Sequence, residues 1–330
     1  MVRRFVPMGF QMASVAYKLV AGFGLDRLKL WLDSARLRIM AYHGVCEDRC
    51  MAEPWLPRHF VARSQFEQQL GYLKANARVL PLAEAVMRLQ NGTLPSRTVC
   101  ITFDDGYSNN LSLAYPLLER YGLPATIFLS TGFLEGASDF FPSDRWRLLR
   151  EARDRSMPPG DLGGSLPDYK TTPIDVVLER VEQRWHQVQW RLSPELRETL
   201  RPLHADELKK FDPRLVDFGA HTHSHCILNN ETPDRRRQEI VRSLECVSQW
   251  TGRPAQLFSY PNGQPGDFGE LDKAVLRSQG VLAAVTTIPG ANRRGCDSLE
   301  LKRYPVGLGH DAHAFAAELT GWRTVLQTFR

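Results

Sequence analysis

The sequence predicts an α/β fold of the barrel type, with about seven strands. Strand-like apolar segments alternate with helix-like segments along most of the chain, which is the element order of parallel α/β folds. Two of the predicted strands are followed by acidic residues or histidines, and such folds place their chemistry at the carboxyl ends of strands. With 330 residues, 43% of them hydrophobic, the chain is long enough for one barrel or two modest domains.

The barrel is expected to occupy residues 37–330. Its seven strands are predicted at 37–43, 98–104, 124–130, 215–220, 256–260, 281–287 and 300–306. Helices are predicted between and after them, at 64–75, 82–90, 111–121, 235–250, 269–279 and 312–320. The interval at about 138–212 breaks this rhythm, with a loop at 157–164 and a helix at 173–190, and is interpreted as an insertion. An insertion after the third strand lies on the side of the site, where it would form a lid or a wall of a substrate groove.

Residues 1–36 are predicted to form an N-terminal amphipathic helical segment. Apolar residues recur at helical spacing between 8 and 32, while no apolar run reaches the ~18 to 20 residues of a membrane span. Two placements stay open: peripheral contact with a membrane surface, or packing on the outside of the barrel. The expected location is the bacterial cytoplasm or a membrane surface, with secretion left open.

The first candidate site follows the apolar run Val99-Cys-Ile-Thr-Phe103. Asp104 and Asp105 come directly after it, and Gly106 opens a turn on which the two side chains point in different directions. One carboxylate is then able to bind a metal while the other accepts a proton. An Asp-Asp pair before glycine is by itself more often only a turn.

The second candidate site follows the strand-like segment at 215–219. His221 and His225 have the spacing of two residues on one face of the first turn of a helix, which suits two imidazoles on one ion. His223 lies between them and is expected to point elsewhere. A single histidine pair is usually structural, but the two motifs together favour a divalent-metal site of Asp105, His221 and His225 with Asp104 beside it.

The charge distribution and the cysteine content each exclude or favour a class of protein. The net charge is +5, and the basic residues are scattered rather than gathered in a stripe with aromatics, which argues against nucleic-acid binding. The six cysteines form no C-x-x-C pair and several stand in apolar segments, so reduced and mostly buried thiols are expected.

These motifs resemble the NodB-homology polysaccharide deacetylases, of the carbohydrate esterase family 4 type. Thr102-Phe-Asp-Asp-Gly106 and His221-Thr-His-Ser-His225 match the first two family motifs unaltered. Further similarity, at 39–45, 123–129 and 258–263, points to the branch of exopolysaccharide and poly-N-acetylglucosamine deacetylases. The resemblance implies a distorted (β/α) barrel and metal-dependent removal of N-acetyl or O-acetyl groups from an acetylated polysaccharide or glycan. Zinc is the favoured metal, with cobalt, nickel or manganese as alternatives.

The motifs and the family resemblance together predict the catalytic roles of individual residues. Asp104 is predicted to be the general base. Leu308-Gly-His-Asp311 matches the letters of the family's late L-x-H-D segment, which makes His310 a candidate general acid, with His43 as a second candidate. The residues expected to contact substrate are His43, Tyr107, Tyr260 and Pro261.

One departure from the family pattern concerns the third motif. The arginine that holds the catalytic aspartate is replaced by Ser259 in Phe258-Ser-Tyr-Pro-Asn-Gly263. Another group must therefore orient Asp104. The alternative functions are deacylation of a lipid-linked or small glycan, and a non-catalytic carbohydrate-binding barrel. The spare carboxylate of Asp104 argues against the second, because binding alone has no use for it.

Overall fold

The computed structural model describes residues 28–30, 35–156, 168–186, 192–308 and 310–321. Residues 28–30 are helical, with Leu30 buried. The rest of the predicted N-terminal segment up to residue 27 lies outside the described residues, so its contact with a membrane stays a prediction. Among the helices described, none combines the length and the apolar character that crossing a membrane requires.

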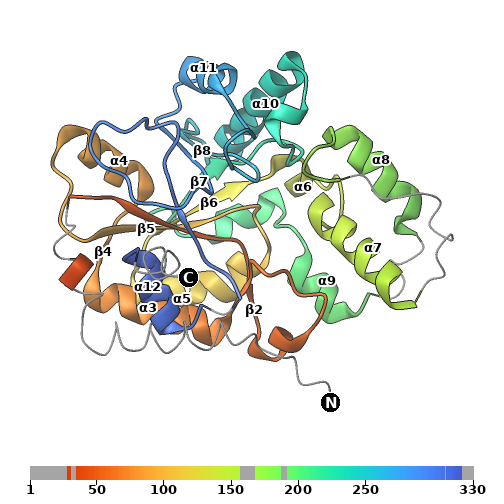
Figure 1. The fold of residues 1–330 in the computed structure, drawn as a ribbon, viewed down its shortest axis with the longest axis horizontal. Helices are drawn as coiled ribbons and strands as arrows, with labels where there is room; N and C mark the ends of the chain where they lie inside the picture. The colour runs from red at the N-terminus through yellow and green to blue at the C-terminus, as the bar shows by residue number, and fades with distance from the viewer. Residues whose placement is uncertain (1–27, 31–34, 157–167, 187–191, 309, 322–330) are drawn as a thin grey trace, which may run out of the picture.

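The fold class is confirmed: a curved parallel sheet forms the centre of the molecule (Figure 1). The strand order is β10-β1-β5-β6-β7-β8-β9, and every pairing along it is parallel. All seven predicted strands are present. Their bounds are β1 Arg38–Tyr42, β5 Thr98–Phe103, β6 Ala125–Leu129, β7 Val216–Ala220, β8 Leu257–Ser259, β9 Ala283–Val285 and β10 Tyr304–Pro305.

The last strand joins the two edges of this sheet. Tyr304 of β10 pairs with Met40 of β1, while Leu301, three residues earlier, pairs with Val285 of β9. The segment from 301 to 305 therefore contacts both β1 and β9 and curls the sheet toward a closed barrel.

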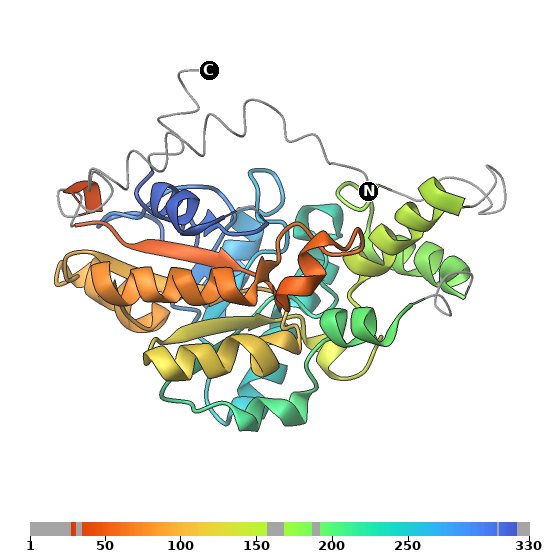
Figure 2. The same ribbon diagram turned by 90° about the horizontal axis from the view of Figure 1, so that it is seen from below.

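Helices cover the sheet on its outside. Figure 2 shows α3 (Arg63–Asn76) and α5 (Tyr115–Tyr121) along one side, and α12 (Ala312–Leu319) packs against α3. The other covering helices are α10 (Pro233–Thr251), which packs on β7, and α11 (Glu270–Ser278), which packs on α10. These helices agree with the predicted ones, because each presents an apolar face at helical spacing.

Side chains from the inner face of the strands form a buried cluster of their own. It joins residues of β1, β5, β6, β8 and β9 with Leu82, Val86 and Leu89 of helix α4 (Leu82–Asn91). Figure 1 shows α4 at the opposite end of the strands from α6 (Thr131–Leu134). Apolar packing thus fills one end of the barrel, and the carboxyl ends of the strands are left for polar residues.

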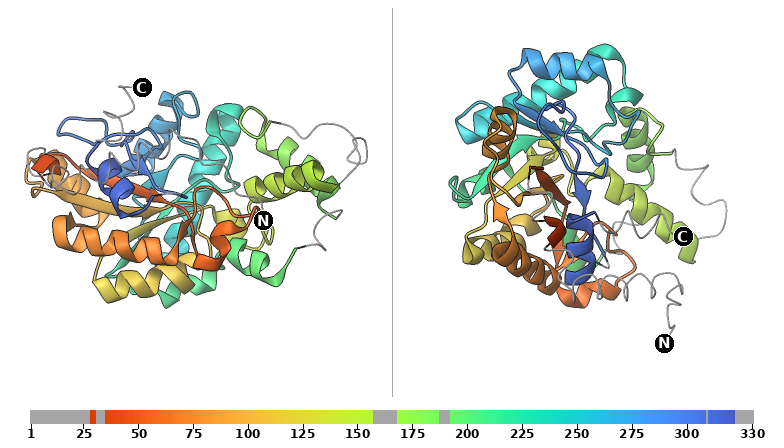
Figure 3. Two further views of the ribbon diagram at one scale, coloured as in Figure 1. Left: turned by 60° about the horizontal axis from the view of Figure 1, so that its bottom comes forward. Right: turned by 60° about the vertical axis from the view of Figure 1, so that its left-hand side comes forward.

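The interval predicted as an insertion is mainly helical. It contains α7 (Pro142–Ser156), α8 (Ile174–Trp185), α9 (Pro194–Leu200) and the short 3-10 helix η4 (Ala205–Lys210). Figure 3 shows α7 and α8 as a layer beside the barrel. The sequence predicted α8 but not α7 or α9, nor the two-residue strands β2 (Val45–Cys46), β3 (Val61–Ala62) and β4 (Arg78–Val79). All six cysteines are free and five of them are buried, as expected.

Candidate active site

Strand β5 delivers Asp104 and Asp105 to the carboxyl end of the sheet. The strand is buried throughout, and the N–H of Asp104 continues the ladder by donating to the Tyr42 carbonyl at 2.9 Å. Asp105 then adopts a left-handed backbone with φ of 73°, followed by Gly106 with φ of 87°. A Cβ on Gly106 would lie 2.9 Å from Leu129 Cδ2, so this turn needs glycine for space as well as for conformation.

Asp105, His221 and His225 converge on one point. His225 Nε2 lies 3.0 Å and His221 Nε2 lies 3.4 Å from Asp105 Oδ1. The Nδ1 atom of His221 donates to the Ser259 carbonyl at 2.7 Å, which leaves a lone pair on its Nε2. Asp105 Oδ1 is buried and accepts no hydrogen bond. Electron pairs facing each other in a buried space repel unless a cation lies between them, so these residues fit a divalent metal.

The predicted helix at His221–His225 is wrong. The segment is a loop, and α10 begins only at Pro233. Thr222 and His225 both have a left-handed backbone, with φ of 59° and 58°, and these two reversals bring the histidines together in place of a helical turn.

Glu239 of α10 holds this loop. Its buried carboxylate accepts the backbone N–H groups of His223 and Ser224, each at 2.8 Å, and the Ser224 hydroxyl at 2.8 Å. The ring of His223 contacts Thr131 instead of the candidate metal ligands, with its Nδ1 3.0 Å from Thr131 Oγ1. Sequence reasoning missed Glu239, because one glutamate in a charged helix carries no distinguishing signal.

Asp104 is held by Arg303, which sequence reasoning also missed. The guanidinium binds both carboxylate oxygens, at 2.8 and 2.6 Å, and is fully buried. It also donates to Ser259 Oγ at 3.0 Å, so the hydroxyl at the position of the absent motif arginine contacts the arginine that replaces it. The available signal was an arginine in the closing strand, where a buried charge requires a partner.

This ion pair sets the charge of Asp104. Burial by itself would raise the pKa of the carboxyl, but the positive charge of Arg303 and its hydrogen bonds outweigh burial and lower that pKa below its ordinary value. Asp104 is therefore ionised at neutral pH, while Asp105 beside it faces the two histidines.

His43 follows β1 and lies within the electrostatic influence of both aspartates. Desolvation lowers the pKa of its imidazole, and the charges of Asp105 and Asp104 oppose that effect only in part. The ring is half-buried and 4.4 Å from the ring of His59, and its Nδ1 has no hydrogen-bond partner. His43 is thus a neutral imidazole at neutral pH with a nitrogen available for a further contact.

His310 lies in a different environment. Its Nδ1 lies 3.0 Å from the Gly307 carbonyl, and its Nε2 is 3.8 Å from the carboxylate of Glu318 on α12. The Gln69 side chain of α3 donates to the His310 backbone carbonyl at 2.7 Å. These contacts place His310 over the outer helices α3 and α12.

Tyr107, Tyr260 and Pro261 are buried. The Tyr107 hydroxyl donates to Asp144 at 2.7 Å, and the Tyr260 hydroxyl donates to the Leu299 carbonyl at 2.9 Å. Both tyrosine side chains predicted to contact substrate are therefore hydrogen-bonded inside the protein.

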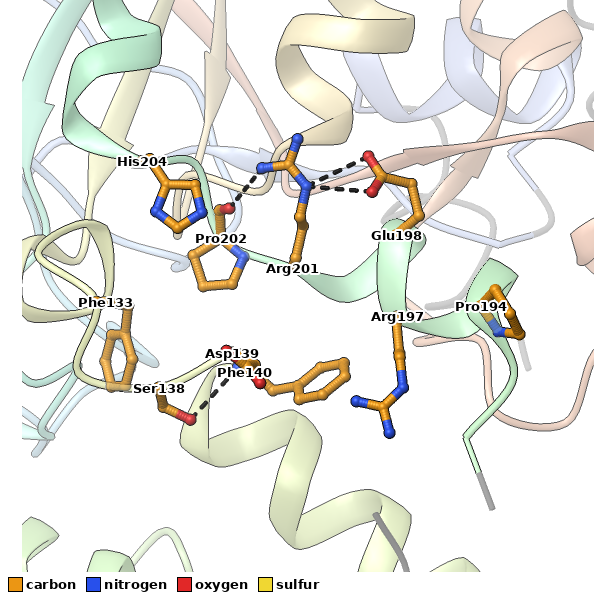
Figure 4. A pocket seen from close by; sticks show the side chains of 11 residues that line it. Phe133, Ser138, Asp139, Phe140, Pro194, Arg197, Glu198, Arg201, Pro202 and His204 are labelled. Carbon is orange, nitrogen blue, oxygen red and sulfur yellow. Dashed lines mark hydrogen bonds and ion pairs between the residues drawn. The ribbon is translucent and has the colours of Figure 1, made fainter. Parts of the chain in front are cut away.

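A pocket of about 320 Å³ is lined in part by α9 and the segment after it (Figure 4), and that segment is hydrogen-bonded to the turn after Asp105. Leu203 donates its N–H to the Gly106 carbonyl at 2.8 Å, and Ser108 donates to the Arg201 carbonyl at 3.0 Å, which ties the end of α9 to that turn. The pocket walls combine aromatic, acidic and basic side chains: Phe133, Asp139, Phe140, Arg197, Arg201 and His204. Such a mixture suits a ligand with apolar faces and many hydroxyl groups.

Comparisons with known proteins agree with this geometry. The family model described as polysaccharide deacetylase matches residues 91–281. The YxkH protein of Bacillus subtilis (strain 168) is 24% identical over 297 residues, which cover 88% of this chain and 80% of that protein. A segment of 90 residues is 38% identical to the poly-beta-1,6-N-acetyl-D-glucosamine N-deacetylase of Staphylococcus aureus (strain MSSA476), covering 27% of this chain and 31% of that protein.

A solved structure shares the fold. The Streptococcus pyogenes deacetylase PplD, determined in complex with acetate, superposes with a TM-score of 0.61 at 18% identity. The match covers 87% of this chain and 99% of PplD.

Proposed function

We propose a hydrolytic function on one premise: the chain belongs to the polysaccharide deacetylase family. It is a hydrolase that removes acetyl groups from a polysaccharide. The observation that carries the proposal is an ionised carboxylate, Asp104, held rigidly by Arg303 beside the convergent group of Asp105, His221 and His225. A barrel that only bound carbohydrate would have no use for this arrangement.

Asp105, His221 and His225 would hold the metal, and we propose zinc. Three protein ligands leave further coordination positions open, as in catalytic rather than structural zinc sites. A divalent ion bound there would polarise the acetyl carbonyl and lower the pKa of a water molecule.

Asp104 then accepts the proton of the attacking water. Arg303 restricts the carboxylate to one orientation by binding both of its oxygens, so no free energy is lost in orienting the base during the reaction. Because the pKa of Asp104 is lowered, the base stays ionised well below neutral pH.

The leaving amine requires a proton donor, and we propose His43 rather than His310. His43 ends the first strand and is coupled to both aspartates, whereas the contacts of His310 are with Gly307 and α12. Because its lowered pKa leaves His43 neutral before the reaction, it would first take up at its unpaired Nδ1 the proton that Asp104 removes from water, and then donate that proton to the amine.

For the substrate we propose an N-acetylglucosamine polymer of the exopolysaccharide type. The segment of 38% identity to the staphylococcal deacetylase supports this choice. A lipid-linked or small glycan is the competing substrate class.

Acetate release tests the function directly. Purified protein reconstituted with Zn²⁺ is expected to release acetate from poly-β-1,6-N-acetylglucosamine faster than from chitin oligomers, O-acetylated xylan or lipid-linked N-acetylglucosamine. Acetate is measured by an enzyme-coupled assay, with the Asp104→Asn variant as background. If folded, metal-loaded protein releases no acetate from any of these substrates, the proposal is refuted. If it releases acetate from the lipid-linked sugar alone, the substrate is a lipid-linked glycan and not a polymer.

The proton donor is tested by comparing an amide with an activated ester. His43→Ala is expected to slow hydrolysis of the N-acetyl sugar by about 10²- to 10⁴-fold and to change its pH–rate profile. Hydrolysis of a phenyl acetate should fall much less, because a phenolate leaves without protonation. His310→Ala is the matched control and should keep the parent's pH profile and amide-to-ester ratio. The opposite pattern in the two variants would assign the acid to His310.

A further inference from the structure

Tyr169 of the inserted segment contacts one of the proposed metal ligands. Its hydroxyl oxygen lies 2.7 Å from His225 Nδ1 and 3.2 Å from the His225 backbone carbonyl. Both contacts are satisfied at once only when the hydroxyl donates to the carbonyl, which only accepts, and the phenol oxygen accepts the Nδ1 hydrogen of the ring. This arrangement leaves the lone pair on Nε2, which faces Asp105 Oδ1 at 3.0 Å.

The same hydroxyl also restrains the backbone of His225. That residue has a φ of 58°, a conformation that residues other than glycine rarely adopt. Rotation of its peptide out of the left-handed region would move the carbonyl that Tyr169 binds. One phenol therefore fixes both the tautomer of the imidazole and the position from which it projects.

Tyr169 belongs to a segment that is attached along the whole loop after His225. The Asn230 amide donates to the Lys170 carbonyl at 3.0 Å, and the Ile174 N–H donates to the Glu231 carboxylate at 2.7 Å. Arg235 adds an ion pair to Asp175 at 3.2 Å. These three contacts hold the segment that carries Tyr169 against the chain that follows His225.

We infer that Tyr169 is a positioning residue for the metal ligand His225, so that the insertion completes the metal site as well as flanking it. The inference rests on the proposed function, since it assumes that Asp105, His221 and His225 bind the ion. Groups that orient a ligating histidine through its second nitrogen typically change metal affinity by about 10- to 100-fold.

The test measures metal binding without reference to catalysis. Metal-free full-length protein is titrated with Zn²⁺ against a competing chelator and with Co²⁺, whose absorption reports ligand geometry. Tyr169→Phe removes only the hydroxyl and is expected to raise the Zn²⁺ Kd by about 10- to 100-fold and to alter the Co²⁺ spectrum. The matched control is Tyr115→Phe. It removes a similar half-buried hydroxyl, which accepts from the Asp212 N–H, and it should leave both readouts unchanged.

The outcomes separate positioning from general stability. Unchanged Zn²⁺ affinity and Co²⁺ spectrum in Tyr169→Phe, with metal binding lost in His225→Ala, would overturn the inference and leave the proposed function intact. Equal metal binding by the parent and His225→Ala would overturn it together with the metal assignment. A Tyr169-dependent Kd in a protein that deacetylates nothing would uphold the inference while the proposed function fails.

Discussion

Asp104→Asn is expected to lower kcat for acetate release by about 10²- to 10⁴-fold, the usual contribution of a general base. The amide has nearly the shape of the carboxylate, but it has no basic oxygen to accept the proton of water. Asp105, His221 and His225 are untouched, so metal stoichiometry should stay that of the parent. Rates measured at saturating substrate, with metal content determined on the same samples, check this result. A kcat within a few-fold of the parent would remove Asp104 from the mechanism.

The same substitution is expected to destabilise the protein, and this must be separated from the catalytic effect. Arg303 is fully buried and loses its only described carboxylate partner, and breaking one side of a buried ion pair typically costs about 3–5 kcal/mol. The double variant Asp104→Asn, Arg303→Met removes both charges and should recover part of the thermal stability without recovering activity. Thermal unfolding followed by circular dichroism provides the comparison.

Removing a metal ligand is expected to have an equally large effect. His221→Ala or His225→Ala should lose the stoichiometric metal and reduce deacetylation by about 10³-fold or more, since a metal supplies several kcal/mol of transition-state stabilisation. His223→Ala is the control from the same loop, and it should retain metal and activity because its ring faces Thr131. Elemental analysis of the dialysed proteins gives the metal content.

The result for His223 also addresses a second group of potential ligands. His223, Glu135 and Cys246 have ligand-type atoms within 4.8 Å of one another, although Glu135 is already paired with Arg242 at 3.0 Å. Metal lost from His223→Ala and kept in His221→Ala would place the ion there. Equal metal content in all three variants would show that neither group holds it.

The sequence predicted the sheet because most of its strands are short apolar runs that parallel packing buries on both faces. It also placed Asp104 and Asp105 correctly at the end of a strand, since only the strand assignment and its direction were needed. The predicted helix at His221 was wrong for a physical reason. The i, i+4 spacing is compatible with a helix, but left-handed residues produce the same proximity. Threonine does not signal such a backbone, and histidine, although enriched there, adopts it too seldom for His225 to have predicted it.

The remaining site residues depend on distant parts of the chain. Tyr169 stands in an insertion with no periodic pattern around it, so nothing local connects it with His225. The letters around His310 match a family segment, yet its ring lies with Gly307 and Glu318, because the loop after the last strand follows its own course. A motif fixes the order of residues and not the path of the backbone between them.

Arg303 makes the order of protein synthesis relevant to this site. It stands 199 positions after Asp104, and a chain growing from its amino terminus forms the aspartate pair long before the guanidinium exists. Until then Asp104 has no partner that would compensate its burial, so its desolvation opposes closure of the barrel around it. The segment from 301 to 305, which contacts β1 and β9, also carries this countercharge. A ribosome-bound chain that stops short of residue 303 therefore has an open sheet and leaves Asp104 without its countercharge, and both gaps are closed in the same step.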